Sequence, residues 1–203
     1  GGTEKVVTVE DPVEFQLTGV SQTPVHRTAG VTFASALRAI LRQDPDVILV
    51  GETRDAETAQ IAVQAALTGH LVLTSLHTTD ALSAVLRLED LGVPRYLLAA
   101  TLSGVVAQRL VRRLCESCEG ASRDRSAPAC DACRSTGYSG RVGMYAFLPV
   151  TDAVRHCIGS GAAPEELEAA AVAAGWAPMH VDGAEKVHRR LTTTEEVANA
   201  LLE

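Results

Sequence analysis

Three short aliphatic runs constrain the fold of this chain most strongly. They are residues 5–9, 47–50 and 71–76, and apolar side chains fill them almost continuously instead of at every second position. Continuous apolar runs of this length are typical of strands that are buried on both faces of a parallel sheet. Helical patterns separate the runs, and strand alternating with helix predicts an α/β fold with a parallel sheet.

Capping residues and turn signals predict helices between and after these runs. Polar side chains that accept backbone N–H groups mark helix starts, and glycine marks helix ends. Apolar residues recur at helical spacing between such marks. The predicted helices are one after Thr32, one over 56–68 between Asp55 and Gly69, one from Thr79 or Asp80 to Gly92, and one over 96–114.

The second half of the chain has a different character. A loop rich in small residues and cysteines covers 115–140, and a short extended segment follows over 142–150. Small helices are expected in the remainder. Their start signals are Asp152, Pro164 in a first turn, and a capping box of Thr193 with Glu196. We therefore expect a structural boundary between 115 and 150.

Composition excludes several broad classes of protein. With 203 residues, 46% of them hydrophobic, the chain can bury a sizeable core. A net charge of −7 with 21% charged residues argues against a disordered chain and against general coating of nucleic acid. The longest weakly polar stretch, 97–107, is much shorter than the roughly 20 residues that a membrane span needs.

Each of the three aliphatic runs leads into a polar group that a core does not need. Glu10 follows the first run, Glu52 the second and His77 the third. Ligands of open α/β sheets bind beyond the carboxyl ends of the strands, so we expect these side chains at one crevice. A carboxylate after a buried strand holds Mg²⁺ or orients a water in nucleotide hydrolases. The alternative is that loop acids only cap the next helix, which explains one such residue more easily than three.

Three stretches resemble motifs of the type II secretion and type IV pilus assembly ATPases. Residues 8–15 resemble the Asp box of that family, 37–52 its Walker B region and 68–78 its His box. The likeness continues through 107–110, the cysteine pairs and 140–143. It therefore covers essentially the whole chain.

The resemblance implies roles for the residues at the strand ends. Glu10 would act on the metal of the nucleotide or on the attacking water, with Asp11 and Glu14 as companions in the Asp box. Glu52 would be the Walker B carboxylate. His77 would sense the terminal phosphate and report hydrolysis to the neighbouring domain.

Arg54 is open to two interpretations. It could bind a phosphate of the nucleotide, or it could form a salt bridge with Asp55 or Glu57. Its neighbour Thr53 and the distant Ala146 depart from the residues usual in the family, and neither lies in the proposed chemistry.

The phosphate-binding loop of such ATPases is missing from the sequence. That loop needs a Gly-Lys pair, and the lysines of the chain, Lys5 and Lys186, each follow a glutamate. In the family the loop lies upstream of the Asp box. Together with the start at Gly1 without a methionine, this leads us to expect the C-terminal part of a motor domain whose phosphate site is incomplete.

Four of the five cysteines form two Cys-x₂-Cys pairs, Cys115 with Cys118 and Cys130 with Cys133. This spacing predicts tetrahedral zinc held by two knuckles, and four thiolates fill the shell of the metal, which favours a structural role. Redox thiols and unrelated loop cysteines are the alternatives. Cys157 has no partner at ligand spacing and is expected to be a small core residue.

Arginines around the cysteines support a rival interpretation. From Arg109 to Arg141, seven arginines outnumber four acidic residues. Such a segment could be a non-enzymatic zinc-knuckle module that binds protein or nucleic acid. Only Tyr138 is available there for base stacking and the whole chain is acidic, so we expect no nucleic-acid partner.

The expected fold is a truncated RecA-like nucleotide-hydrolase core with a parallel sheet over 1–114, a zinc knuckle over 115–140 and a small α-helical subdomain over 141–203. The resemblance implies ATP, Mg²⁺ and Zn²⁺ as cofactors. It also implies a parent protein that hydrolyses ATP to drive pilus or pseudopilus assembly or type II secretion. The implied assembly is a homo-hexamer bound to an inner-membrane platform protein, peripheral to the cytoplasmic face of the inner membrane.

Overall fold

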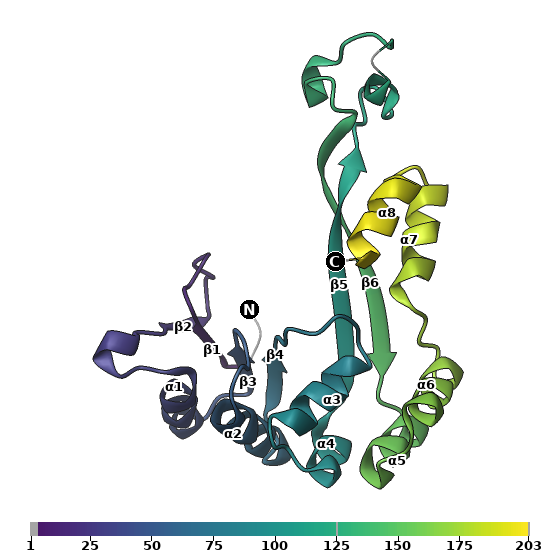
Figure 1. Ribbon diagram of the computed structural model, residues 1–203. Helices are drawn as coiled ribbons and strands as arrows, with labels where there is room; N and C mark the ends of the chain where they lie inside the picture. The colour runs from purple at the N-terminus through teal and green to yellow at the C-terminus, as the bar shows by residue number, and fades with distance from the viewer. Residues whose placement is uncertain (1–3, 125, 203) are drawn as a thin grey trace. The chain divides into compact units, whose positions relative to one another are not determined.

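The computed structural model describes residues 4–124 and 126–202 (Figure 1). The chain forms two compact units, each built from two stretches. Unit 1 comprises Gly1–Ser103 with Val150–Ala174, and unit 2 comprises Gly104–Pro149 with Gly175–Glu203. The limits of these units differ from the three ranges expected from the sequence, because the chain crosses between the units three times.

A parallel sheet forms the centre of unit 1. Its strands lie in the order β2-β1-β3-β4, and every neighbouring pair is parallel. The expected α/β fold with a parallel sheet is thereby confirmed, and the three aliphatic runs supply β1, β3 and β4. The sequence did not predict β2, because its residues are polar and show no apolar pattern. The strands are β1 (Val6–Glu10), β2 (Ser21–Pro24), β3 (Val47–Val50) and β4 (Leu71–Thr74).

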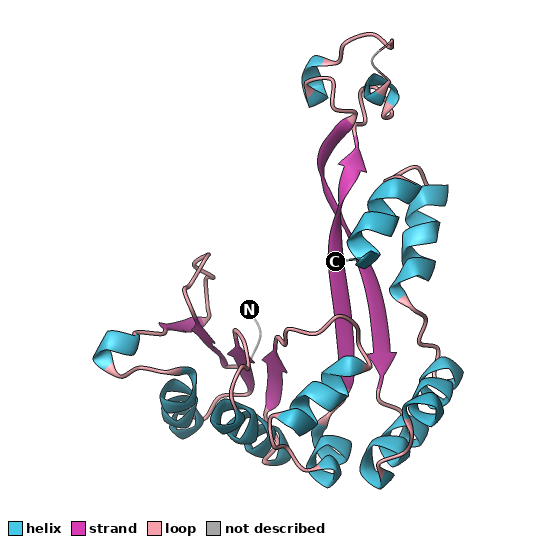
Figure 2. Cartoon of the chain, viewed as in Figure 1, coloured by secondary structure: helices cyan, strands magenta, loops and turns pink. Residues whose placement is uncertain are grey.

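Helices complete unit 1 (Figure 2). Two of the predicted N-caps are confirmed: the Thr32 side chain accepts the N–H of Ser35 before α1, and Asp55 accepts that of Thr58 before α2. The helix predicted from Thr79 or Asp80 begins later, at Ser83 with Leu82 as its N-cap. Thr151, and not Asp152, occupies the N-cap position of α5. The helices are α1 (Phe33–Ile40), α2 (Ala56–Leu67), α3 (Ser83–Asp90), α4 (Arg95–Thr101), α5 (Asp152–Ser160), α6 (Pro164–Ala173) and the short 3-10 turns η1 (Arg27–Ala29) and η2 (Leu41–Gln43).

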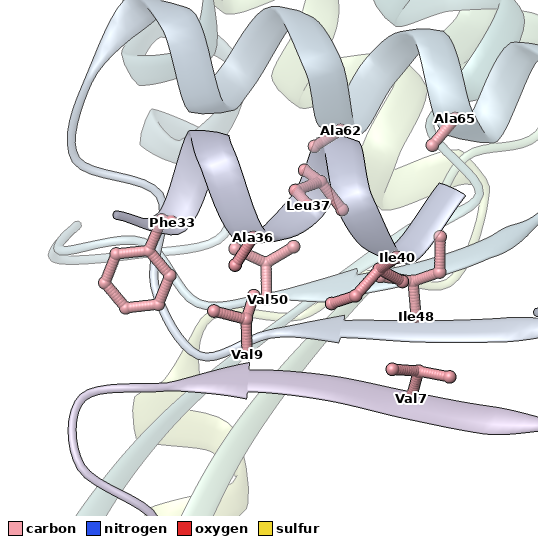
Figure 3. Close-up of a cluster of buried hydrophobic side chains, with 10 residues drawn as sticks. All are labelled: Val7, Val9, Phe33, Ala36, Leu37, Ile40, Ile48, Val50, Ala62 and Ala65. Atoms are coloured by element: carbon pink, nitrogen blue, oxygen red, sulfur yellow. The ribbon is translucent and has the colours of Figure 1, made fainter. Parts of the chain in front are cut away.

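The core of unit 1 lies between the sheet and helices α1 and α2. Figure 3 shows the side chains of β1 and β3 directed toward those of α1. Leu37, Ile48 and Val50 are fully buried. Burial on both faces holds less well at β4, where Leu71 is 54% and Leu73 49% exposed. Both leucines lie on the face of the sheet opposite the core, whereas Val72 between them pairs with Ile48 and packs against the core.

Unit 2 is built on a long antiparallel ribbon of β5 (Gly104–Leu114) and β6 (Tyr138–Pro149). The predicted helix over 96–114 is therefore wrong: α4 ends at Thr101, and β5 begins at Gly104. The segment is rich in β-branched valine, and β6 supplies its hydrogen bonds from residues that lie far along the chain, such as Pro149 opposite Gly104. The extended segment predicted over 142–150 is confirmed and begins earlier, at Tyr138.

Two helices cover one face of this ribbon, α7 (Met179–His188) and α8 (Thr194–Leu202). Met144 and Val111 of the ribbon form a core with Met179 and Val197 of the helices. The turns η3 (Ala121–Arg123) and η4 (Asp131–Cys133) lie in the cysteine loop between the strands. Within the described residues, no helix is long and apolar enough to span a membrane.

Candidate functional site

The carboxyl ends of β1 and β3 are joined by backbone contacts that place Glu10 next to the loop carrying Glu52. Val9 pairs with Val50, and the N–H of Gly51 continues the ladder by donating to the Val9 carbonyl at 2.8 Å. A Cβ on Gly51 would lie 3.1 Å from that carbonyl oxygen. Glycine therefore allows the close approach that brings the two strand ends together.

The Glu52 carboxylate is the centre of a small polar cluster. Its side chain is only 14% exposed, and its Oε2 lies 3.2 Å from His77 Nε2. Oε2 also accepts a close hydrogen bond from Arg54 Nε. His77 itself is 74% exposed, so one of its faces is free to meet a ligand. Two of the three expected strand-end groups are thus in direct contact.

Arg54 pairs with neither of the two partners that the sequence suggested. The Asp55 carboxylate caps α2, and Glu57 pairs with Arg38 at 2.6 Å. The salt bridge of Arg54 to Glu52 was not anticipated, because the sequence does not show which way a side chain turns after a strand.

Two hydroxyl groups tie the loop after β3 to the end of β4. Ser75 Oγ donates to the Gly51 carbonyl at 2.6 Å, and the Thr53 N–H donates to the Ser75 carbonyl at 3.0 Å. The buried Thr53 hydroxyl also lies 2.8 Å from that of Thr74. These contacts position Glu52 and His77, and sequence reasoning missed them. The polar Thr53 in a family position that is usually apolar was the signal that could have found this pair.

The Glu10 carboxylate is held by its own strand and by β2. It accepts hydrogen bonds from the Thr8 hydroxyl and, at 2.9 Å, from the side-chain amide of Gln22. Sequence reasoning missed Gln22 because it did not predict β2. These two donors orient the Glu10 carboxylate.

Asp11 and Glu14 are placed differently from Glu10. Asp11 forms an exposed ion pair with Arg27 at 3.2 Å. Glu14 is exposed, and within residues 4–124 and 126–202 no hydrogen bond or ion pair reaches its side chain. The structure therefore shows no contact of either residue with the Glu52 cluster.

The four paired cysteines converge in unit 2. Their Sγ atoms all lie within 4.8 Å of one another. The closest pairs cross between the knuckles, with 4.0 Å from Cys115 to Cys130 and 3.8 Å from Cys118 to Cys133. Four converging soft sulfur donors fit tetrahedral zinc.

Hydrogen bonds and burial move the pKa values of two of these thiols in opposite directions. Ser122, through its hydroxyl and then its N–H, lowers the pKa of Cys118 to about 6. The N–H of Cys133 lowers the pKa of Cys130, but burial and the three neighbouring thiols raise it by more, to about 11. Because zinc binds thiolates, protons would compete with a metal at this cluster, and its affinity would fall with the pH.

The comparisons with known proteins identify the family. The profile of the type II/IV secretion system protein family matches residues 2–199. The chain belongs to this family. The match extends far beyond the cysteine loop on both sides, so the interpretation as a free-standing zinc-knuckle module is not favoured.

Curated members of the type II/IV secretion system family agree with this assignment. The chain is 53% identical to the type II secretion system protein HxcR of Pseudomonas aeruginosa, over 96% of the chain and 42% of HxcR. It is 44% identical to the type IV pilus assembly ATPase PilB of Thermus thermophilus, over 97% of the chain and 24% of PilB. The chain thus spans less than half the length of these relatives.

Solved structures match the fold of this family member. The pilus retraction motor PilT with bound ADP gives a TM-score of 0.75 at 30% identity, over 97% of this chain and 52% of that one. The ATPase DotB of Legionella pneumophila gives 0.72 at 25% identity, over 98% of this chain and 52% of that one.

Proposed function

We propose that this chain is part of an ATPase motor that hydrolyses ATP with Mg²⁺ to drive pilus or pseudopilus assembly or type II protein secretion. The observation that carries the proposal is the cluster at the carboxyl ends of β1, β3 and β4. There Glu52 contacts His77, and Glu10 lies on the neighbouring strand. The likeness to secretion and pilus ATPases over nearly the whole chain supports it.

The residues of the cluster have distinct roles in this proposal. Glu52 and Glu10 supply the negative charge that binds hydrated Mg²⁺ and orients the attacking water, which are the usual tasks of carboxylates in phosphoryl transfer. His77 senses the terminal phosphate and reports hydrolysis to a neighbouring domain. Arg54, which pairs with Glu52 in the structure, would bind a phosphate of the nucleotide. Asp11 and Glu14, both exposed to solvent, assist Glu10 in its contact with the metal or the water.

The four cysteines hold one structural zinc ion in the same proposal. Four thiolates leave no coordination position for a substrate, so the metal folds the loop and takes no part in hydrolysis. The long β5–β6 ribbon carries this loop at its end (Figure 1).

The likeness to secretion and pilus ATPases also supports a proposal for the assembly and its location. The motor is a homo-hexamer in which the identical subunits form a ring. Its further partner is the polytopic platform protein of the secretion or pilus machine. It lies at the cytoplasmic face of the inner membrane, as a peripheral protein, and binds no nucleic acid.

Substitutions at the strand ends test the proposed activity in the full-length protein. Glu52→Gln keeps the shape and removes the charge, so we expect nucleotide binding to survive while turnover falls by roughly 10², the scale of losing one preorganised electrostatic group. Glu10→Gln should behave similarly, and His77→Ala should weaken both turnover and its coupling to motion. Steady-state ATPase rates and nucleotide titrations measure this. Rates close to those of the unaltered protein in both glutamine variants would show that the carboxylates are structural.

A further inference from the structure

The chain segment that closes the cysteine loop contains a glycine that touches both knuckles. Gly137 donates its N–H to Cys133 Sγ at 3.3 Å, and its carbonyl accepts the N–H of Cys115 at 2.9 Å. One residue thus links a ligand of the second knuckle to the backbone of a ligand of the first. An N–H that points at a thiolate disperses its charge and fixes its orientation, which strengthens metal binding.

Gly137 also occupies a place where no side chain fits. It is buried and has a φ of +75°, a conformation that favours glycine. A Cβ there would lie 2.2 Å from Arg123 Cγ and 3.0 Å from the Gly120 carbonyl oxygen. The first distance is far below ordinary van der Waals contact and the second is tight. Neither atom is the far end of a flexible side chain, because one is in the middle of a side chain and the other is backbone.

Arg123 cannot simply swing away from this position, because its guanidinium is anchored at three points. Nε donates to the Gly120 carbonyl at 3.3 Å, and Nη1 donates to the Tyr138 hydroxyl at 3.2 Å. The guanidinium carbon lies 5.7 Å from the centre of the Tyr138 ring, within cation–π range. A methyl group on Gly137 would therefore displace Arg123 and the backbone at Gly120, which follows the ligand Cys118.

We propose that Gly137 is a positioning residue of the zinc site, which supports the Cys133 thiolate and lets the two knuckles close on the metal. This inference rests on the proposed zinc site. It adds a requirement outside the four ligands. The backbone N–H of residue 137 must face the thiol cluster, and residue 137 must have no Cβ, because a Cβ there would clash with residues 120 and 123.

Gly140 provides a matched control. It lies three residues further along the chain, in β6, with a φ of +74°, and no atom lies within 4 Å of the Cβ that alanine would add. Gly140→Ala therefore carries the same left-handed backbone strain as Gly137→Ala without the collision. A double variant, Arg123→Ala with Gly137→Ala, removes the Cγ and Cδ atoms that the new methyl group would strike.

The experiment measures zinc content, zinc affinity by competition with a chelator, and the thiolate-to-metal absorption of the cobalt-substituted protein, all on the full chain. We expect one zinc per unaltered chain. Gly137→Ala should bind zinc at least about tenfold more weakly, the scale seen for residues outside the ligand shell, and shift the cobalt absorption. The zinc affinity of Gly140→Ala should stay within about twofold of that of the unaltered chain. The double variant should regain part of the affinity that Gly137→Ala loses.

Two results would overturn the inference on Gly137: equal zinc affinities of the two alanine variants, or no recovery in the double variant. Misfolding of the loop does not hide the effect, because knuckle folding and metal binding are one equilibrium and a loop that folds poorly registers as weaker binding. If the unaltered protein, purified without chelator, contains no zinc, the proposed zinc site itself fails. That result is distinct from the other two.

Discussion

At the scale of single residues, the structure assigns partners that decide what each charged side chain does. Glu196 is an example, because the sequence predicts it as half of a capping box with Thr193. The Thr193 hydroxyl does accept the Glu196 N–H, at 3.3 Å. The Glu196 carboxylate, however, turns to β5 and accepts the Arg112 N–H at 3.1 Å and its guanidinium at 2.6 Å. A residue expected to cap a helix therefore also fastens that helix to the ribbon.

This pairing predicts a pH dependence of stability. The Arg112 side chain, followed by its N–H, holds the pKa of Glu196 below its usual value against the opposing effect of burial. The pKa is lower in the folded state, so the stabilisation is fully present above the ordinary glutamate pKa and is lost as the pH falls through the native pKa. We expect Glu196→Gln to lower the free energy of unfolding by about 1–2 kcal/mol at pH 7, on the scale of a hydrogen bond to a charged group. The variant should also lose less stability than the unaltered protein when the pH is lowered. Thermal unfolding between pH 7 and pH 3 measures this, and identical pH profiles for variant and unaltered protein would contradict it.

At the scale of elements, position in the sheet decides how much a residue matters. Ile48 in the central strand β3 is fully buried, whereas Leu71 in the edge strand β4 is 54% exposed. Both side chains are aliphatic and of equal size, and both come from runs that look alike in the sequence. The face of the sheet makes the difference, because Ile48 and its β4 neighbour Val72 pack on the core side, whereas Leu71 pairs with Val47 on the opposite face.

These two residues form a matched pair for mutation. Ile48→Ala removes methyl groups from a closely packed core and leaves a cavity, so we expect a loss of about 2–5 kcal/mol in the free energy of unfolding. Leu71→Ala should cost less than half as much, because half of its side chain already meets solvent. Denaturant titration measures both values. Equal losses would mean that β4 is covered in solution.

At the scale of the whole molecule, the chain carries catalytic candidates but no anchor for the triphosphate. Glu10, Glu52 and His77 would act on a phosphate and its Mg²⁺ once another element has fixed the nucleotide in place. That element is a glycine-rich loop with a lysine, and neither lysine of the 203 residues follows a glycine. Positioning supplies much of the catalysis of phosphoryl transfer, so the remaining groups should achieve little without it.

We therefore expect the 203-residue chain to hydrolyse no ATP above background and to bind it weakly at best. The measurement is a steady-state ATPase assay with a nucleotide titration, run beside the full-length protein, in which we expect such a loop. Activity and affinity should appear in the full-length protein. Comparable values from both proteins would show that the phosphate site lies elsewhere in these residues.

The sequence by itself determined the features that depend on near neighbours. The aliphatic runs of β1, β3 and β4, the caps at Thr32 and Asp55, and the cysteine spacing all follow from the chemistry of adjacent residues. Only the tertiary structure decided the features that depend on distant partners, namely the polar strand β2, the strand β5 in place of a helix, and the turn of Arg54 toward Glu52. Residues 104–114 suit a helix or a strand when taken alone, and β6 decides between them by supplying hydrogen bonds from across the ribbon. Local patterns specify elements, whereas pairing between distant segments specifies partners, and only the folded chain contains that pairing.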